Sequence, residues 1–399
     1  MDDRTRIGAN VRSARLRRGM SLAVVAGLAG RSAAWLSLIE RGLRPLERRS
    51  DLAALANALQ ISPVDLTGQP YVPDDGKHPA AAADATIVRV RQAIQDLPDP
   101  AAADEPDRLV ADVETLTDLR LSLDLAGLGA ALPGLLRRLR ATIPVVTRAE
   151  DRARLLRAYF WTAQGAQSLT RNLGHLDLAW VAAGHMRTTA EDIDDPVWLS
   201  ASEFARAHAL IPAGAARAAL AYASAGADLA STAAGPDAAA AHGALQLVGA
   251  YAAALAGRLD EADDRLTTAD RLAAGKTGPT FTRGFSFGAP NVVLHRMSVA
   301  VESGKPAQVA AAAAKLPAGA LPSAERRATY WIDLGRAYAQ MRRDDDAIQV
   351  LRWAEEIAPL RVRLHPLVRE AVAGMVERRA RAAVGRELRG LAYRMGLPH

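Results

Sequence analysis

The segment GFSFG at residues 284–288 matches the G-x-S-x-G pattern of hydrolases in which the serine is the nucleophile. That chemistry requires the serine on a sharp turn between a strand and a helix, with a histidine base in reach. The residues before Gly284 are instead rich in threonine, glycine and proline, and they lie in a region of helical periodicity. We therefore expect no catalytic residue and no enzyme activity, with a hydrolase that uses Ser286 as an alternative.

Other patterns that could support chemistry are incomplete. GKT at residues 275–277 ends like a phosphate-binding loop, but Asp270 stands where that loop needs its first glycine. The chain has no cysteine, which excludes disulfides, thiolate metal sites and cysteine nucleophiles. Its eight histidines are scattered without the spacing of metal ligands. The sequence therefore predicts no metal site and no cofactor.

A candidate ligand pocket involves four residues of the long C-terminal region. Pro290 can open a helix, which would place Asn291 and His295, four residues apart, on one face. An asparagine amide offers both donors and an acceptor, so it can clamp a peptide backbone. With Phe287 and Trp180, these residues are predicted to line an inner pocket. The alternative is that the asparagine caps or bridges neighbouring helices.

The elements that would position these side chains are predicted to be helices. Half of the 399 residues are hydrophobic but only 5% are aromatic, and alanine supplies much of the apolar share. Alanine has the highest helix propensity and lets helix axes approach each other closely. Apolar residues recur at helical spacing, and no alternating strands flanked by hairpin turns are found. The sequence predicts an all-α chain of two or three domains.

Positive charge is concentrated near the N-terminus. Residues 1–70 contain 11 arginines and 6 acidic residues, whereas residues 71–399 contain 39 basic and 38 acidic residues. A basic domain of this kind suits an anionic partner such as nucleic acid. The N-terminal sequence lacks the apolar core of a signal peptide, and the uncharged stretch 238–257 is rich in alanine and glycine. We expect a cytoplasmic protein that does not bind a membrane, with residues 238–257 forming a buried helix.

Residues 22–42, LAVVAGLAGRSAAWLSLIERG, carry the pattern of a helix-turn-helix. The motif needs a small residue where its two helices cross, a glycine in the turn, and apolar residues facing inward on the second helix. The residues that meet these needs are Ala26, Gly30, Leu36 and Ile39. The motif lies within five predicted short helices over residues 4–66, with Ser21 and Ser32 as the caps of the second and third.

Residues 5–67 resemble the XRE family of bacterial repressor-type helix-turn-helix domains, including the phrase LSLIERGLRP at residues 36–45. The resemblance implies that residues 32–41 enter the major groove of a double-stranded operator. It also implies an ion pair between Arg15 and Glu40. The residues expected at the DNA interface are Ser21, Arg31, Ser32, Ala33, Ala34, Trp35, Ser37, Leu38, Arg41 and Arg44.

The expected contacts divide by chemistry. The small residues of the second helix and Leu38 would face bases, Trp35 would flank the backbone or a thymine methyl, and Arg31, Arg41 and Arg44 would meet phosphates. This face is poor in the side chains that pair with base edges, so specificity would depend on methyl contacts, water and DNA shape. The alternative is that the five helices form a protein–protein module.

Residues 328–359 follow the spacing of a tetratricopeptide repeat. The matching positions are Trp331, Leu334, Gly335, Tyr338, Ala347, Leu351, Ala354 and Pro359. Weaker copies occur in GRLDEADDRLTTAD and GHLDLAWVAAG. A helix pair of this kind cannot bury its apolar face alone, so we expect about seven to nine repeats.

The whole chain is similar to a group of large actinobacterial regulators that join an XRE domain to a degenerate tetratricopeptide array. In related receptors of Gram-positive bacteria, the repeats bind a peptide or small molecule and change how the dimer binds DNA. The expected organisation is a DNA-binding domain at residues 1–68, a linker at 69–85, and a tetratricopeptide-like α-solenoid at 86–399. We expect a homodimeric transcriptional regulator that senses a small-molecule or peptide effector; the alternative is a repeat-based adaptor tethered to DNA.

Overall fold

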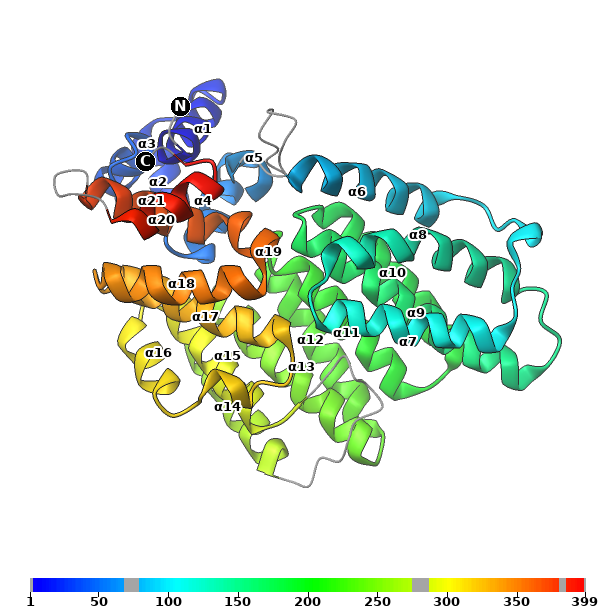
Figure 1. The fold of residues 1–399 in the computed structure, drawn as a ribbon. Helices are drawn as coiled ribbons and strands as arrows, with labels where there is room; N and C mark the ends of the chain where they lie inside the picture. The colour runs from blue at the N-terminus through cyan, green and yellow to red at the C-terminus, as the bar shows by residue number, and fades with distance from the viewer. Residues whose placement is uncertain (1–2, 68–78, 275–286, 380–384, 398–399) are drawn as a thin grey trace.

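The computed structural model describes residues 3–67, 79–274, 287–379 and 385–397, and within these ranges the protein is all-α. An N-terminal helix-turn-helix domain is followed by a larger helical domain, as the sequence predicts (Figure 1). The helices of the N-terminal domain are α1 (Asp3–Arg17), α2 (Leu22–Leu28), α3 (Ala33–Glu40), α4 (Arg49–Leu59) and α5 (Pro63–Thr67).

Local signals in the sequence define the helix-turn-helix. The hydroxyl oxygens of Ser21 and Ser32 accept hydrogen bonds of 3.2 Å from the backbone N–H groups of Val24 and Trp35, which caps α2 and α3. Gly30, in the turn between them, has a φ of +65°, a conformation that glycine adopts without strain. The two helices meet at 107°, within the range of about 90–120° that is typical of the motif.

A single apolar core holds the five helices together, and α1 crosses α3 unusually closely. A Cβ atom on Gly8 would lie 2.3 Å from the backbone oxygen of Ile39. Only glycine permits this approach, because the obstacle is main chain and cannot rotate away. The buried core residues of the domain are Ile7, Val11, Ala14, Val25, Ala26, Trp35, Leu36, Ile39, Leu46, Leu52, Leu55, Ala56, Leu59 and Leu66.

The larger domain is built from helices that pack on their neighbours in the chain, as α9 does on α10, α12 on α13 and α17 on α18. Its α-helices are α6 (Pro79–Gln95), α7 (Pro106–Leu121), α8 (Leu125–Thr142), α9 (Ala149–Asn172), α10 (Leu176–Ile193), α11 (Pro196–Leu210), α12 (Ala216–Thr232), α13 (Pro236–Leu255), α14 (Leu259–Ala274), α15 (Ala289–Glu302), α16 (Pro306–Ala313), α17 (Ala324–Gln340), α18 (Asp344–Ile357), α19 (Pro359–Arg363), α20 (Pro366–Arg379) and α21 (Arg386–Arg394). Two short 3₁₀ helices are η1 (Pro100–Ala102) and η2 (Ala318–Ala320).

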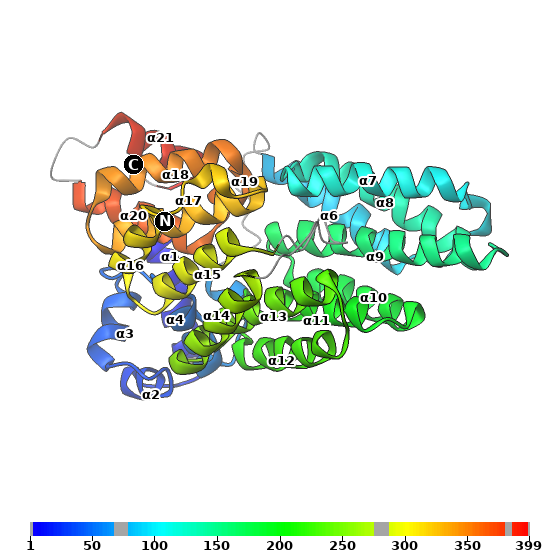
Figure 2. The same ribbon diagram turned by 90° about the horizontal axis from the view of Figure 1, so that it is seen from below.

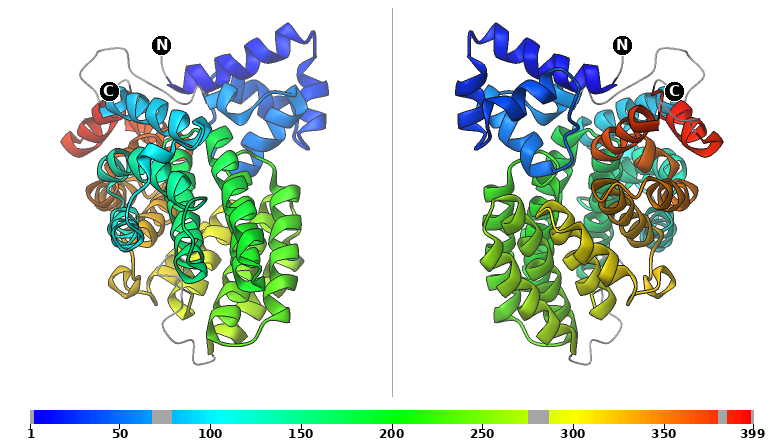
Figure 3. Two further views of the ribbon diagram at one scale, coloured as in Figure 1. Left: turned by 90° about the vertical axis from the view of Figure 1, so that its right-hand side faces the viewer. Right: turned by 90° about the vertical axis from the view of Figure 1, so that its left-hand side faces the viewer.

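The C-terminal helices of the larger domain lie next to the N-terminal domain. The C-terminal helices α20 and α21 lie at the same end of the molecule as the N-terminal domain, and α1 contacts α20 (Figures 1 and 2). Seen from the side, the N-terminal domain lies on one end of the long helices of the larger domain (Figure 3). The N-terminal domain is therefore in direct contact with distant parts of the chain.

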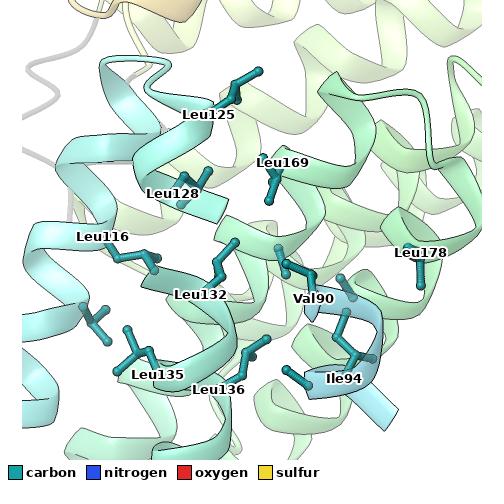
Figure 4. Packing of buried hydrophobic residues seen from close by; sticks show 14 of the residues in the cluster. Val90, Ile94, Leu116, Leu125, Leu128, Leu132, Leu135, Leu136, Leu169 and Leu178 are labelled. Atoms are coloured by element: carbon teal, nitrogen blue, oxygen red, sulfur yellow. The ribbon is translucent and has the colours of Figure 1, made fainter. Parts of the chain in front are cut away.

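The first helices of the larger domain share a leucine-rich core. Leu128, Leu132, Leu135 and Leu136 of α8 are buried and project toward α6, α7 and α9, where Leu169 lies (Figure 4). Their spacing of four, three and one places them on one face of the helix. Burial of each such side chain contributes about 1.5–3 kcal/mol relative to exposure.

The α17–α18 pair contains the predicted repeat. Gly335 and Ala347 lie where the two helices touch, and a Cβ on Gly335 would come within 2.6 Å of the Leu351 side chain. The two weaker copies begin the second helices of the α9–α10 and α13–α14 pairs, where Ala179 and Ala262 are fully buried. The small residues of all three phrases thus lie at helix–helix contacts.

Among the described residues, α13 is long and apolar enough to span a membrane. The same is true of α2 and α3 if they are taken together as one bent segment. In the structure 72% of the apolar window of α13 is buried. The helix contacts α11, α12, α14 and α15. The expectation of a buried helix at residues 238–257 therefore agrees with its packing.

Two expectations concern segments between helices. The predicted linker at 69–85 is too long at its C-terminal end, because α6 begins at Pro79. Proline is well suited to the first position of a helix, where its missing N–H costs no hydrogen bond. Residues 68–78, the GKT segment and Ser286 lie outside the described residues.

Candidate DNA interface and inner cavity

The exposed face of α3 lies at its first two turns. Ser32, Ala33 and Ala34 are exposed, and Ser37 and Leu38 are half-buried. The opposite face, including Leu36 and Ile39, is buried in the core. These five side chains are therefore on the solvent side of the second helix of the motif, which is the helix that enters the major groove in proteins of this architecture.

An ion pair joins α1 to the end of α3, as the resemblance implies. Arg15 donates two hydrogen bonds to the Glu40 carboxylate, Nε to Oε1 at 2.6 Å and Nη2 to Oε2 at 2.8 Å. The bond to Glu40 raises the pKa of Arg15 against the opposing effect of burial. Arg15 also donates to the backbone oxygen of Met20 at 3.0 Å. One guanidinium therefore connects α1, the following turn and α3.

The structure corrects the predicted role of Trp35, whereas Arg31 is exposed and its phosphate contact stays a prediction. Trp35 is only 9% exposed and belongs to the core of the domain, so it does not flank DNA as expected. Arg31 forms an ion pair with Asp51 of α4, with Nε donating to Oδ1 at 3.0 Å, and its guanidinium lies 5.7 Å from the centre of the Trp35 ring. Trp35 is buried because it lies on the inward face of α3, where its backbone N–H donates to the cap residue Ser32.

Arg41 and Arg44 remain exposed beside α3. Arg41 donates from Nε to the backbone oxygen of Ser37 at 3.3 Å. Arg44 and Leu38 line a cleft of about 600 Å³ that Arg342 and Arg378 of the larger domain also line. These two additional arginines come from the C-terminal quarter of the chain, and no local pattern indicates their proximity to α3.

Glu302 of α15 connects the two domains. Its Oε2 accepts a hydrogen bond of 2.8 Å from the backbone N–H of Arg49 in α4. Its Oε1 accepts from Arg336 Nη1 at 3.0 Å and from the Tyr251 hydroxyl at 3.2 Å. Burial raises the pKa of Tyr251, so its hydroxyl stays protonated and remains a donor. The carboxylate is buried and is held by donors from three helices.

Two further contacts join the domains on either side of Glu302. Arg336 donates from Nη2 to the backbone oxygen of Glu47 at 2.8 Å. The Glu370 carboxylate of α20 accepts from the backbone N–H of Leu46 at 3.3 Å. The loop between α3 and α4 is thereby fixed to the larger domain through its main chain.

An inner cavity of about 190 Å³ lies among helices of the larger domain. Its lining comes from the alternate helices α7, α9, α11, α13, α15 and α17, together with Arg361 of α19, His365 and Arg49 of α4. Alternate helices line the inner surface of a solenoid of helix pairs, because the other helix of each pair faces outward. We call this space the inner cavity.

The residues predicted for the ligand pocket are not brought together. His295 lines the inner cavity, and its Nδ1 lies 2.9 Å from the backbone oxygen of Asn291, one helical turn earlier. The Asn291 side chain is buried and accepts a hydrogen bond from Arg326 Nε, in agreement with the bridging alternative.

The two aromatic residues lie elsewhere, which corrects their predicted role. Trp180 is 36% exposed, 5.8 Å from the Tyr222 ring, with Arg206 against both rings. Phe287 packs in the core against α13, where a Cβ on Gly243 would lie 2.1 Å from its ring. The helical register alone gives the side of a helix on which a residue lies, but not which helix covers that side.

Comparison with known proteins supports the assignment of the N-terminal domain. Residues 6–67 match the model of a helix-turn-helix domain family. No curated protein matches the chain. The N-terminal domain is thus a helix-turn-helix of the XRE-like type, a fold of DNA-binding regulators, and it is joined to an all-helical domain.

Proposed function

We propose that this protein is a sequence-specific transcriptional regulator that binds a double-stranded operator through α3. The observation that carries the proposal is the exposed N-terminal half of α3, in a domain whose two motif helices meet at 107°. Exposed Arg41 and Arg44 supply phosphate contacts at the end of the same helix. In this role the protein acts in the cytoplasm as a homodimer and catalyses no reaction.

The larger domain, in this proposal, is a tetratricopeptide-like array of the actinobacterial type that senses an effector. Three helix pairs with small residues at their contacts support the repeat assignment. A cavity lined by alternate helices supports the sensing role, since a solenoid offers its inner surface to ligands.

A DNA-binding experiment tests the proposal. Purified full-length protein is used to capture fragments of genomic DNA, and the enriched site is mapped by footprinting. We expect a two-fold symmetric site with half-site centres about 34–36 Å apart, as for dimers of this motif. If no sequence is enriched and a pull-down with the same protein instead yields one stoichiometric protein partner, the adaptor function is favoured.

Arginine variants separate the contacts by chemistry. Arg41→Ala and Arg44→Ala should each weaken binding to all DNA sequences alike and reduce the salt slope by about one. Arg157→Ala, an exposed arginine of α9, is the matched control and should change neither quantity. A loss confined to the specific site in either variant would contradict the phosphate role.

A further inference from the structure

The inner cavity has a strongly positive lining. The arginines among its lining residues are Arg49, Arg120, Arg171, Arg326, Arg336 and Arg361. Among the described residues, two acidic residues, Glu325 and Asp333, line it beside them, and Glu302 lies next to Arg49 and Arg336. Six guanidinium groups therefore face three carboxylates in the described part of the chain.

The carboxylates present are already engaged. Glu325 accepts from Arg171 Nη2 at 2.8 Å. Burial alone would raise the pKa of Glu325, but Arg171, Arg361 and Arg120 together hold it well below its usual range. Burial lowers the pKa of Arg361 to about 10, although Glu325 opposes the change. One carboxylate is thus shared by several cations, which leaves positive charge uncompensated.

Hydrogen-bonding capacity in this lining is also unused. Arg120 is only 5% exposed, and its Nη2 has no hydrogen-bond partner among the residues that the structure describes. The Nε atoms of Arg171 and Arg336 are likewise buried without a partner in the described ranges. A buried charged donor without a partner costs stability, because it has lost its hydration and gained nothing in return. Three such donors around one cavity indicate that the partner is a molecule other than this chain.

We propose that the inner cavity binds a small organic anion with two or more negative charges, of the phosphate or polycarboxylate type. The proposal rests on the sensing role given above to the larger domain, and it names the chemical class of the effector. A guanidinium binds carboxylate and phosphate oxygens through paired N–H groups, so both subclasses fit the same lining.

The position of the cavity links the ligand to the DNA-binding domain. Arg49 of α4 lines the inner cavity, and its Nη2 lies 2.8 Å from Nε2 of His365. A second cavity of about 110 Å³ lies between the two domains and shares Arg49, Arg171 and Arg361 with the first. A bound anion would attract Arg49 and hold α4 against the larger domain. Ligand binding therefore strengthens the contact between the domains.

Thermal unfolding and calorimetry of the full-length protein test this inference. The probes are pyrophosphate and citrate, with glycerol as a neutral control and sodium chloride added to equal ionic strength. We expect a saturable rise in Tm of several degrees with at least one anion and none with glycerol. The anion that produces it distinguishes the phosphate from the carboxylate subclass. No saturable shift with either anion would overturn the inference.

Two variants test whether the effect arises in the cavity. Gln164 is 6% exposed and lines the cavity, and no described residue donates a hydrogen bond to its Oε1. Gln164→Glu adds a carboxylate of the same shape, so it should raise the Tm of the free protein and weaken anion binding at least tenfold. Arg120→Met removes an uncompensated charge and should also raise the Tm while reducing the anion shift. The exposed control Arg157→Met should behave as wild type.

The outcomes separate this inference from the proposed function. If both variants lower the Tm and leave the anion shift unchanged, the arginines are structural and the ligand class is wrong. Operator binding is measured in the absence of any anion probe, so it can succeed when the anion inference fails. Saturable anion binding with no enrichment of any DNA sequence would retain the cavity assignment and refute the regulator.

Discussion

The Glu302 carboxylate caps α4 of the DNA-binding domain from a different domain, through the hydrogen bond of 2.8 Å that it accepts from the backbone N–H of Arg49. The residue at the N-cap position, Arg48, makes no side-chain capping bond. A carboxylate at the N-terminus of a helix satisfies an orphan N–H group and interacts favourably with the helix dipole. The DNA-binding domain therefore depends on the larger domain for this capping contact.

The first prediction concerns this cap. Glu302→Gln should lower the free energy of unfolding by about 3–5 kcal/mol, because the buried Arg336 loses its nearer charged partner and keeps only Asp333, at 3.6 Å. The measurement is urea unfolding of the full-length protein. Glu191→Gln is the control, since the partly exposed Glu191 pairs with Arg187 on the same helix and should contribute less than about 1 kcal/mol. Equal effects of the two substitutions would contradict the role of Glu302.

The second prediction concerns the crossing of α1 and α3. Gly8→Ala places a Cβ against the backbone oxygen of Ile39, so the helices must separate and the free energy of unfolding should fall by about 1–3 kcal/mol. Operator affinity should fall with it, because α1 supports the recognition helix.

Gly27→Ala is the matched control for Gly8. Gly27 lies in α2, and a Cβ there would meet nothing within 4 Å. The higher helix propensity of alanine should stabilise this variant by up to about 1 kcal/mol. If Gly8→Ala is as stable as Gly27→Ala, the close approach does not exist in solution.

The third prediction tests the packing of α17 on α18. Gly335→Ala brings a Cβ within 2.6 Å of Leu351, so α17 and α18 should separate at a cost of about 1–3 kcal/mol. Thermal unfolding measures the effect. In α10, Gly184→Ala meets nothing within 4 Å and should raise the Tm slightly. A Tm for Gly335→Ala at or above the wild-type value would refute the tight contact.

The fourth prediction concerns acidic pH. Burial lowers the pKa of His295 to about 4, with Arg326 acting in the same direction. Burial also lowers the pKa values of His208 and His365, aided by nearby arginines. These groups stay neutral in the folded protein while the unfolded chain binds protons below its usual pKa of about 6.5. Stability is therefore full above that pH and falls as the pH decreases toward 4.

The size of this effect can be measured. His295 alone should contribute about 3 kcal/mol to the loss of stability. Unfolding is followed between pH 7.5 and pH 4.5 in buffers without phosphate or citrate, which would occupy the proposed cavity. His295→Gln should lose less stability over this range than the wild type. An identical pH dependence would show that His295 does not titrate as described.

Much of the N-terminal domain could be predicted because its signals are local. Ser21 and Ser32 cap the helices that directly follow them, and Gly30 forms the turn between those helices. The pairing of Arg15 with Glu40 could be inferred from the resemblance to a known family. The prediction failed for Trp35, since a single helix does not reveal how far its inward face extends.

The sequence by itself determined the helices, their caps and the helix-turn-helix, because the interactions that specify them lie within a few residues of one another. The tertiary structure alone decided which side chains meet. Arg120, Gln164 and Arg336 line one cavity although they come from three separate helices, and Trp180 lies outside it. Helical periodicity gives the direction of a side chain about its own helix, whereas the neighbours that it meets depend on how all the helix pairs pack together.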